Sequence, residues 1–259
     1  MIKIQKSRLS HSVKAHDSQV HDCPDTQAIP DHPHNALIIG RRGAGKSTVM
    51  VSLLNTDMKK GGLRKRFKTI YAVSPTMEHD GKYKRLYDEI SEEGNHYTEP
   101  TEEVFSEILD KIKEMRKEHP KEQSLLILDD VVDKLKGSHS QSLLNHLIIA
   151  GRHYGLCIYT LSQKLNSIST IARNNAEVWI LFNIANRKEY ETFINEMNYD
   201  PKKLDEIYQT AMDGGGSNNF LTINSSNCRM RFFRRFDPMC ITSDIVGAPT
   251  GTEAESETD

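Results

Sequence analysis

The sequence lacks long hydrophobic runs, paired cysteines and a signal-like start. No stretch of about eighteen apolar residues occurs, so no membrane-spanning helix is expected. The first residues, MIKIQKSRLSHS, hold no continuous apolar stretch of signal-peptide length, which argues against secretion. The cysteines lie far apart without a CxxC pair, which favours neither a disulfide scaffold nor a zinc ribbon and fits a reducing compartment. They are Cys23, Cys157, Cys228 and Cys240.

A strong charge imbalance is also missing. The 259 residues have a formal net charge of −2, but residues 242–259 contain five acidic side chains and no Lys or Arg. Without this segment the chain has a net charge of +3, which permits a polyanionic partner without requiring one. We expect 242–259 to form an acidic, disordered tail, because it is poor in apolar residues.

The first 33 residues are polar and contain several histidines and prolines. We expect 1–33 to form an irregular lead-in to a folded domain that covers 34–241. Metal binding by the histidines together with Cys23 is an open alternative, although their spacing matches no standard site. These histidines are His11, His16, His21 and His32.

Between these ends, short apolar runs alternate with helical patterns. The runs are apolar nearly throughout, as in strands that are covered on both faces of a parallel sheet. We expect strands at Ala36–Gly40, Thr69–Ser74, Leu125–Asp129, Leu156–Leu161 and Val178–Phe182. Helical patterns cover Lys46–Met58, Thr101–Glu118, Gln141–His153, Arg187–Met197 and Pro201–Met212. The sequence therefore predicts an α/β domain with a mostly parallel, doubly wound sheet, helices on both faces, and a C-terminal β-hairpin at Phe220–Phe236 with Ser225, Ser226 and Asn227 at its turn.

The strongest motif is a phosphate-binding loop that fits GxxxxGK[ST] between the first strand and the first helix. Its residues are Gly40, Arg41, Arg42, Gly43, Ala44, Gly45, Lys46, Ser47 and Thr48. The glycines let backbone N–H groups converge on phosphate oxygens, and the helix that follows directs its positive end at the same anion. Lys46 would place a cation at the β- and γ-phosphates of ATP, and the Ser47 hydroxyl would bind Mg²⁺.

A second strand, SLLILDD, ends in two carboxylates. We expect Asp129 to hold Mg²⁺ through water and Asp130 to be the catalytic base that polarises the attacking water. The alternative for Asp130 is a simple cap of the next turn. Gln163, which follows the strand Leu156–Leu161, is predicted to be a polar sensor near the γ-phosphate; its alternative is an ordinary loop glutamine.

Transition-state charge at such a site needs a further cation. Three arginines are candidates, and any of them could instead be an ordinary surface residue: Arg152, Arg173 and Arg187. A finger that acts on a neighbouring subunit would require an oligomer. The sequence contains neither the NKxD motif of GTPases nor an LSGGQ-type motif, which weakens the GTPase and transporter interpretations.

The order of these motifs resembles that of the viral DNA-packaging ATPases of the HerA/FtsK superfamily, of the poxvirus, giant-virus and virophage type. The resemblance covers residues 35–198 and rests on NALIIGRRGAGKST, KTIYAVSPT, SLLILDDV and GRHYGLCIYTLSQKLNSISTIARNNAEVWILF. It implies a P-loop NTPase fold and an ATPase that uses ATP and Mg²⁺ and drives double-stranded DNA into a preformed capsid. It also implies a ring, commonly a hexamer, with capsid proteins as partners and a place in the host cytoplasm, viral factory or virion.

By matching motif, the resemblance gives the nucleotide loop to Lys46, Ser47 and Thr48, the paired acids to Asp129 and Asp130, and the sensor to Gln163. Arg152 is then the first choice for the trans-acting finger and Arg173 the second. Sequence-independent DNA binding has two candidate surfaces, each of which could also be an ordinary solvated segment. They are Lys59, Lys60, Arg64, Lys65, Arg66 and Lys68, and Arg229, Arg231, Arg234 and Arg235.

Two other functions remain open. One is a cellular HerA/FtsK-like translocase in repair or segregation. The other is a nucleotide-gated binding switch that does not move DNA and would hydrolyse ATP slowly, without a response to duplex DNA.

Overall fold

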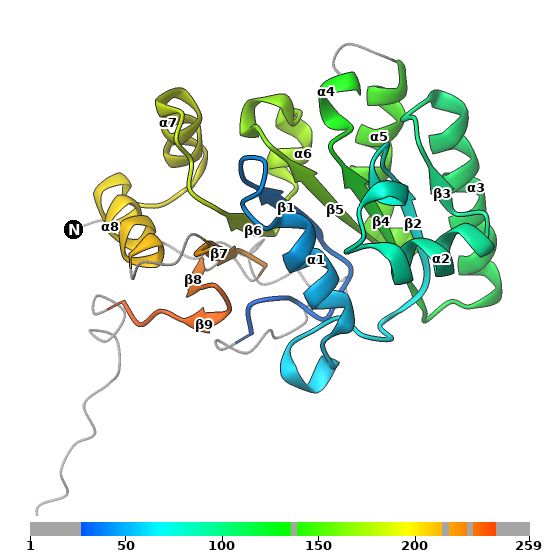
Figure 1. The fold of residues 1–259 in the computed structure, drawn as a ribbon, viewed down its shortest axis with the longest axis horizontal. Helices are drawn as coiled ribbons and strands as arrows, with labels where there is room; N and C mark the ends of the chain where they lie inside the picture. Colours follow the sequence, from blue (N-terminus) through cyan, green and yellow to red (C-terminus); the bar gives the residue numbers. More distant parts are fainter. Residues whose placement is uncertain (1–26, 136–138, 214–217, 227–229, 242–259) are drawn as a thin grey trace, which may run out of the picture.

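Nine strands form one sheet in the order β3-β2-β4-β5-β1-β6-β7-β8-β9 (Figure 1). The computed structural model describes residues 27–135, 139–213, 218–226 and 230–241. The strands are β1 Asn35–Ile39, β2 Phe67–Val73, β3 His96–Tyr97, β4 Gln123–Asp129, β5 Leu156–Ser162, β6 Val178–Leu181, β7 Leu221–Asn224, β8 Arg231–Arg234 and β9 Asp237–Pro238. The pairs from β3 to β6 are parallel, and those from β6 to β9 are antiparallel.

Eight α-helices are described around this sheet. They are α1 Lys46–Asn55, α2 Lys84–Glu92, α3 Glu102–Glu118, α4 Val132–Leu135, α5 His139–Ala150, α6 Thr170–Asn174, α7 Arg187–Glu196 and α8 Pro201–Met212. Alternate residues of each strand point to opposite faces of the sheet. In β1, Ile38 belongs to the core cluster that α1 and α2 cover, whereas Leu37 and Ile39 belong to the cluster on the other face, with α3, α5, α7 and α8. The predicted doubly wound sheet with helices on both faces is therefore confirmed.

The C-terminal hairpin is also confirmed, and it extends the parallel sheet. β7 pairs antiparallel with β6 and then with β8, so that Leu221 lies opposite Leu181 on one side and Arg234 on the other. Ser225 and Ser226 lie at the described part of the turn, where the Ser226 amide donates to the Asn224 side chain at 3.0 Å. Asn227 lies outside the described residues. All four residues of β7 are buried, and the strand is paired on both sides, with β6 and with β8.

Two helices end earlier than expected, other boundaries shift by one or two residues, and some elements were not predicted. The first helix ends at Asn55 instead of Met58, because Thr56 is extended and Asp57 starts a separate 3₁₀ turn. The helix expected over 141–153 ends at Ala150 and continues as a 3₁₀ turn, Gly151–Tyr154. The helices α2, α4 and α6 and the edge strands β3 and β9 were not predicted. The strands have two residues each, and α4 and α6 have four and five, which is too short for a readable periodicity.

The described end of the lead-in, residues 27–33, is packed against the domain. Ala28 and Ile29 are buried, and the Arg66 side chain donates to the carbonyls of Pro30 at 2.6 Å and His32 at 2.8 Å. The His32 ring also contacts the Glu177 carboxylate at 2.6 Å. The other histidines of the lead-in, Cys23 and the acidic tail lie outside the described residues.

Arg66 must be removed from the predicted DNA-contacting set. Its side chain is 8% exposed and its guanidinium is used internally, also by Gln123 at 3.2 Å. In the second basic set, Arg234 donates to the Asp213 carbonyl and Arg235 to Asn219 at 3.1 Å, while Arg229 lies outside the described residues. In the part of the chain that the structure covers, no helix has the length and apolar character needed to cross a membrane.

Candidate nucleotide site

The loop Gly40–Thr48 leaves the carboxyl end of β1 and enters α1, as predicted. Gly43 has φ 78° and Gly45 has φ 110°, backbone angles that residues with a Cβ rarely adopt. Gly40 is required for a different reason, because a Cβ there would come within 2.8 Å of Phe182. The loop is thus shaped by Gly40 and Gly45, which the motif specifies, and by Gly43, which it does not.

The amino end of α1 is prepared for an anion. Its N-cap is Gly45, which supplies no side-chain hydrogen bond to the first-turn amides, and the first turn contains no acidic residue. Uncapped amides and the helix dipole together favour negative charge at this point. Ser47 is half-buried in the loop. Thr48, Arg41 and Arg42 are exposed to solvent.

Lys46 is buried, with 7% of its surface exposed, and its ammonium donates to the Gly40 carbonyl at 2.9 Å. Burial lowers the pKa of Lys46, while the charges of Asp130 and Asp129 act in the opposite direction. The ammonium therefore lies across the loop in the field of both acids. A phosphate entering the loop would supply the negative charge that this buried cation lacks at contact distance.

The two acids at the end of β4 have different environments. Asp129 is 4% exposed, and burial, followed by the charge of Asp130, raises its pKa from 3.8 to about 6. Asp130 is exposed and has φ 54°, a left-handed conformation that turns its side chain out of the strand direction. The Asp129 carboxylate therefore lies inside the site, and the Asp130 carboxylate lies at its solvent-exposed edge.

Gln163 is brought directly to Asp130. Its amide nitrogen donates to the Asp130 carboxylate at 3.1 Å, because β5 lies between β4 and β1 and ends at the same edge of the sheet. The register places Asp129 opposite Leu161, and Ile39 opposite Ser162. Loop, acids and glutamine thus meet at the carboxyl ends of three neighbouring strands.

The predicted arginines lie elsewhere. Arg152 is exposed in the 3₁₀ turn before β5, at the sheet edge opposite the loop. Arg173 is 11% exposed and is held within its own chain by Glu196 at 2.7 Å and by the Ile168 carbonyl. Arg187 pairs with Glu191 at 2.8 Å along α7. None of the three contacts the loop of its own subunit, so their role as fingers remains a prediction about a neighbouring one.

One residue of the site was not predicted. Tyr83, the N-cap of α2, is 1% exposed and lies beside Ser47 and Asp129. Burial, and then the charge of Asp129, raises its pKa above the ordinary range for tyrosine. The only signal in the sequence was its place after the strand β2; the closeness to Asp129 arises because β2 pairs with β4.

The residues present fit a magnesium ion that is shared with a nucleotide. Ser47 and Asp129 would supply hard oxygen ligands, and the Tyr83 hydroxyl beside them is a buried polar atom without a partner in the described chain. Among the described residues, no group of three or more His, Cys, Asp or Glu side chains could hold a metal ion by itself. Phosphate oxygens and water would therefore complete the coordination.

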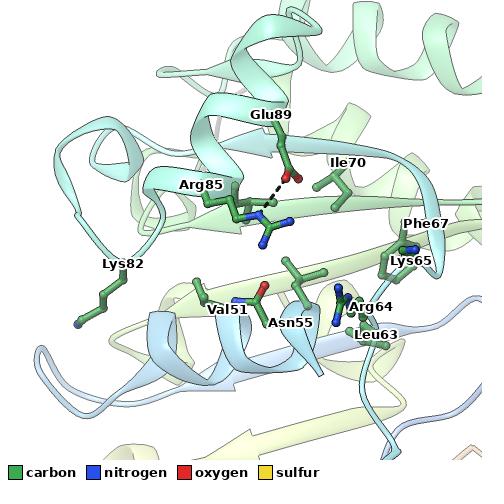
Figure 2. Close-up of a pocket in the computed structure, with 12 residues that line it drawn as sticks. Val51, Asn55, Leu63, Arg64, Lys65, Phe67, Ile70, Lys82, Arg85 and Glu89 are labelled. Atoms are coloured by element: carbon green, nitrogen blue, oxygen red, sulfur yellow. Dashed lines mark hydrogen bonds and ion pairs between the residues drawn. The ribbon is translucent and has the colours of Figure 1, made fainter. Parts of the chain in front are cut away.

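A hollow of about 540 Å³ lies away from the loop, between α1, β2 and α2 (Figure 2). Its floor is apolar, with Leu63 and Ile70, and its cations are Arg64, Lys65, Lys82 and Arg85. Arg85 pairs with Glu89 across one turn of α2, as the figure shows. None of the nine loop residues lines it, so we call it the basic groove and treat it apart from the nucleotide site. A smaller hollow, of about 360 Å³, borders Gly40, Arg41 and Gln163.

The fold and the loop together define a P-loop NTPase. The chain belongs to the family described as Poxvirus A32 protein, whose family model matches residues 25–214. A comparison with curated proteins finds no match.

Solved structures with the same fold include two viral enzymes. The DNA-packaging ATPase B204 of Sulfolobus Turreted Icosahedral Virus has a TM-score of 0.56 at 19% identity, over 82% of this chain and 99% of that chain. The genome packaging NTPase B204 of Sulfolobus turreted icosahedral virus 2, in complex with AMP, has a TM-score of 0.56 at 16% identity, over 82% and 100%. The resemblance drawn from the motifs is thus confirmed in family and fold.

Proposed function

We propose that this protein is an ATP-hydrolysing translocase that packages double-stranded viral DNA into a preformed capsid. The observation that carries the proposal is the meeting of the loop, Asp129, Asp130 and Gln163 at one edge of the sheet, in a chain of the Poxvirus A32 protein family. The B204 relatives are described as packaging enzymes, and their complexes with AMP, AMPPCP and ATP-gammaS support nucleotide binding by this fold.

The residues divide the work of hydrolysis by position. The α1 amides and Lys46 would bind the phosphates, with the Lys46 ammonium exchanging the Gly40 carbonyl for phosphate oxygen. Ser47 and Asp129 would hold Mg²⁺, which neutralises phosphate charge when bound. Asp130 would accept the proton of the attacking water, and Gln163 would keep that carboxylate in place.

A ring, commonly a hexamer in this family, would bring Arg152 of one subunit to the nucleotide of the next. Arg152 is exposed, whereas the Arg173 side chain is only 11% exposed, which supports Arg152 as the first choice for a contact with a neighbouring subunit. DNA contact is proposed for the exposed cations of the basic groove, of which Arg64 and Lys65 belong to the first basic set. Such contacts to phosphates are independent of sequence. Capsid proteins are the further partners that this function requires, in the host cytoplasm or viral factory.

The test is ATP hydrolysis by the purified full chain with and without duplex DNA. Turnover should rise with DNA of any sequence and fall as salt increases. Lys46→Ala should abolish both rates, whereas Lys188→Ala, an exposed lysine on α7, should change neither. Slow turnover that ignores DNA would instead support the nucleotide-gated switch. Neighbouring genes for a capsid protein and a maturation protease would separate the viral motor from a cellular one.

A further inference from the structure

The hydroxyl of Tyr83 is an unusual buried group. The residue is 1% exposed, and its hydroxyl oxygen has no hydrogen-bond partner within the described chain. A buried hydroxyl without a partner costs on the order of 1–3 kcal/mol, so native proteins rarely keep one without a reason. A phenylalanine would fill the same space without this cost.

Two other buried tyrosines, Tyr159 and Tyr208, have their hydroxyls satisfied. The Tyr159 hydroxyl contacts the His34 ring at 2.8 Å, and that of Tyr208 accepts from the Ile184 amide at 2.7 Å and donates to the Phe182 carbonyl at 3.1 Å. The Tyr83 ring packs in the same apolar cluster as Met77 and Ile90, but its hydroxyl lies beside Ser47 and Asp129. The fold thus leaves one of its buried phenols open at the nucleotide site.

The neighbours of this hydroxyl are the two predicted metal ligands. It lies close enough to Asp129 and Ser47 to interact with both side chains. It nevertheless makes no hydrogen bond that meets the ordinary limits of distance and angle. The turn Thr76–Tyr83 brings it there: the Tyr83 amide donates to the Asp80 carbonyl at 2.8 Å, and the Asp80 side chain accepts from the Lys82 amide at 3.1 Å. These contacts hold the backbone at Tyr83, and the burial of its ring beside Met77 and Ile90 limits where the hydroxyl can lie.

We propose that Tyr83 is a positioning residue of the magnesium side of the site, whose hydroxyl donates to Asp129, or to water that Asp129 holds, once metal and nucleotide bind. The inference rests on the proposed nucleotide site. A hydrogen bond from a fixed neighbour orients a ligating carboxylate and its water, and loss of such a contact typically weakens metal binding ten- to a hundredfold. Tyr83 itself need not touch the metal.

The test is Tyr83→Phe, which removes only the oxygen. The affinity for a fluorescent ATP analogue is measured with Mg²⁺ and again with EDTA, and Mn²⁺ bound to the protein–nucleotide complex is measured by electron paramagnetic resonance. The metal-dependent gain in nucleotide affinity, and the Mn²⁺ affinity, should fall about tenfold or more, while the affinity in EDTA stays as in the wild type. Tyr87→Phe, on α2 with its ring edge-to-face against His96, is the matched control and should change nothing.

Three other results of this experiment would overturn either the role of Tyr83 or the proposed function. Unchanged metal dependence in Tyr83→Phe would overturn the role of the hydroxyl while leaving the nucleotide site intact. A lower melting temperature of the ligand-free variant would show that the hydroxyl serves the fold, and would overturn the inference as well. If the wild type bound nucleotide in neither condition, the proposed function itself would fail.

Discussion

The side-chain amide of Gln163 donates to the Asp130 carboxylate at 3.1 Å, joining the ends of β5 and β4. Asp130→Asn keeps the shape of the site but removes the base, so ATP should remain bound while turnover falls about a hundred- to ten-thousandfold. Gln163→Ala should lower turnover less, by about tenfold, because it only releases the carboxylate. Equilibrium binding and single-turnover hydrolysis measure the two effects separately. Loss of ATP binding in Asp130→Asn would place Asp130 among the metal ligands instead.

Asp129 should make stability depend on pH. Its pKa is raised in the folded state, from 3.8 to about 6, so the folded chain binds an extra proton between these values. Protonation of Asp129 therefore favours the folded state. This stabilisation is fully present below about pH 4 and is lost as the pH rises through 6. Two units correspond to on the order of 3 kcal/mol.

Asp129→Asn removes this ionisation. The ligand-free variant should be more stable than the wild type at pH 7.5, with a gain that shrinks towards pH 4.5, as measured by urea unfolding at several pH values. Asp88→Asn, an exposed carboxylate on α2, is the control and should show no such trend. A gain that stays constant with pH would mean that the buried carboxylate is not the cause.

The basic groove should contribute to the salt dependence of DNA binding. Arg64→Gln/Lys65→Gln removes two exposed cations, and each phosphate contact changes the slope of log K against log salt by about 0.9. The slope should therefore decrease by about 1.8 if both contact phosphates. Lys202→Gln/Lys203→Gln, exposed on α8, changes the net charge equally and should leave the slope almost unchanged. Equal slopes in both double variants would remove the groove from the DNA-binding surface.

The two candidate fingers should behave differently. Arg173→Ala breaks the ion pair with Glu196 and should cost about 3 kcal/mol of stability, whereas the main effect of Arg152→Ala should be on the ATPase rate of the assembled subunits. Mixtures of Arg152→Ala and Lys46→Ala subunits should recover part of the ATPase activity, because some boundaries then combine an intact loop with an intact Arg152. Absence of recovery at every ratio would favour a structural role for Arg152.

Much of the fold could be read from the sequence because the inner strands are apolar nearly throughout. The meeting of Lys46 with Asp129 also follows, since parallel strands bring their carboxyl ends to one edge. Helix α2 was not found, because its apolar side consists of little more than Leu86, Tyr87 and Ile90 among charged residues.

The missed contacts depend on strand order and on individual side-chain directions. Tyr83 reaches Asp129 only because β2 is the neighbour of β4, which no local pattern reveals. Arg66 looks like its neighbours in a basic run, yet carbonyls 34 and 36 residues away hold it inside the protein. Composition cannot tell which cation of a run turns inward.

Both outer strands of the described sheet, β3 and β9, are two residues long, and β9 contains Pro238. They offer little free main chain for a strand of another copy to pair with. Subunits of the proposed ring would therefore join through helix and loop side chains rather than by extending the sheet. Such boundaries can loosen and close again during each catalytic turn while the backbone ladder of every subunit stays whole.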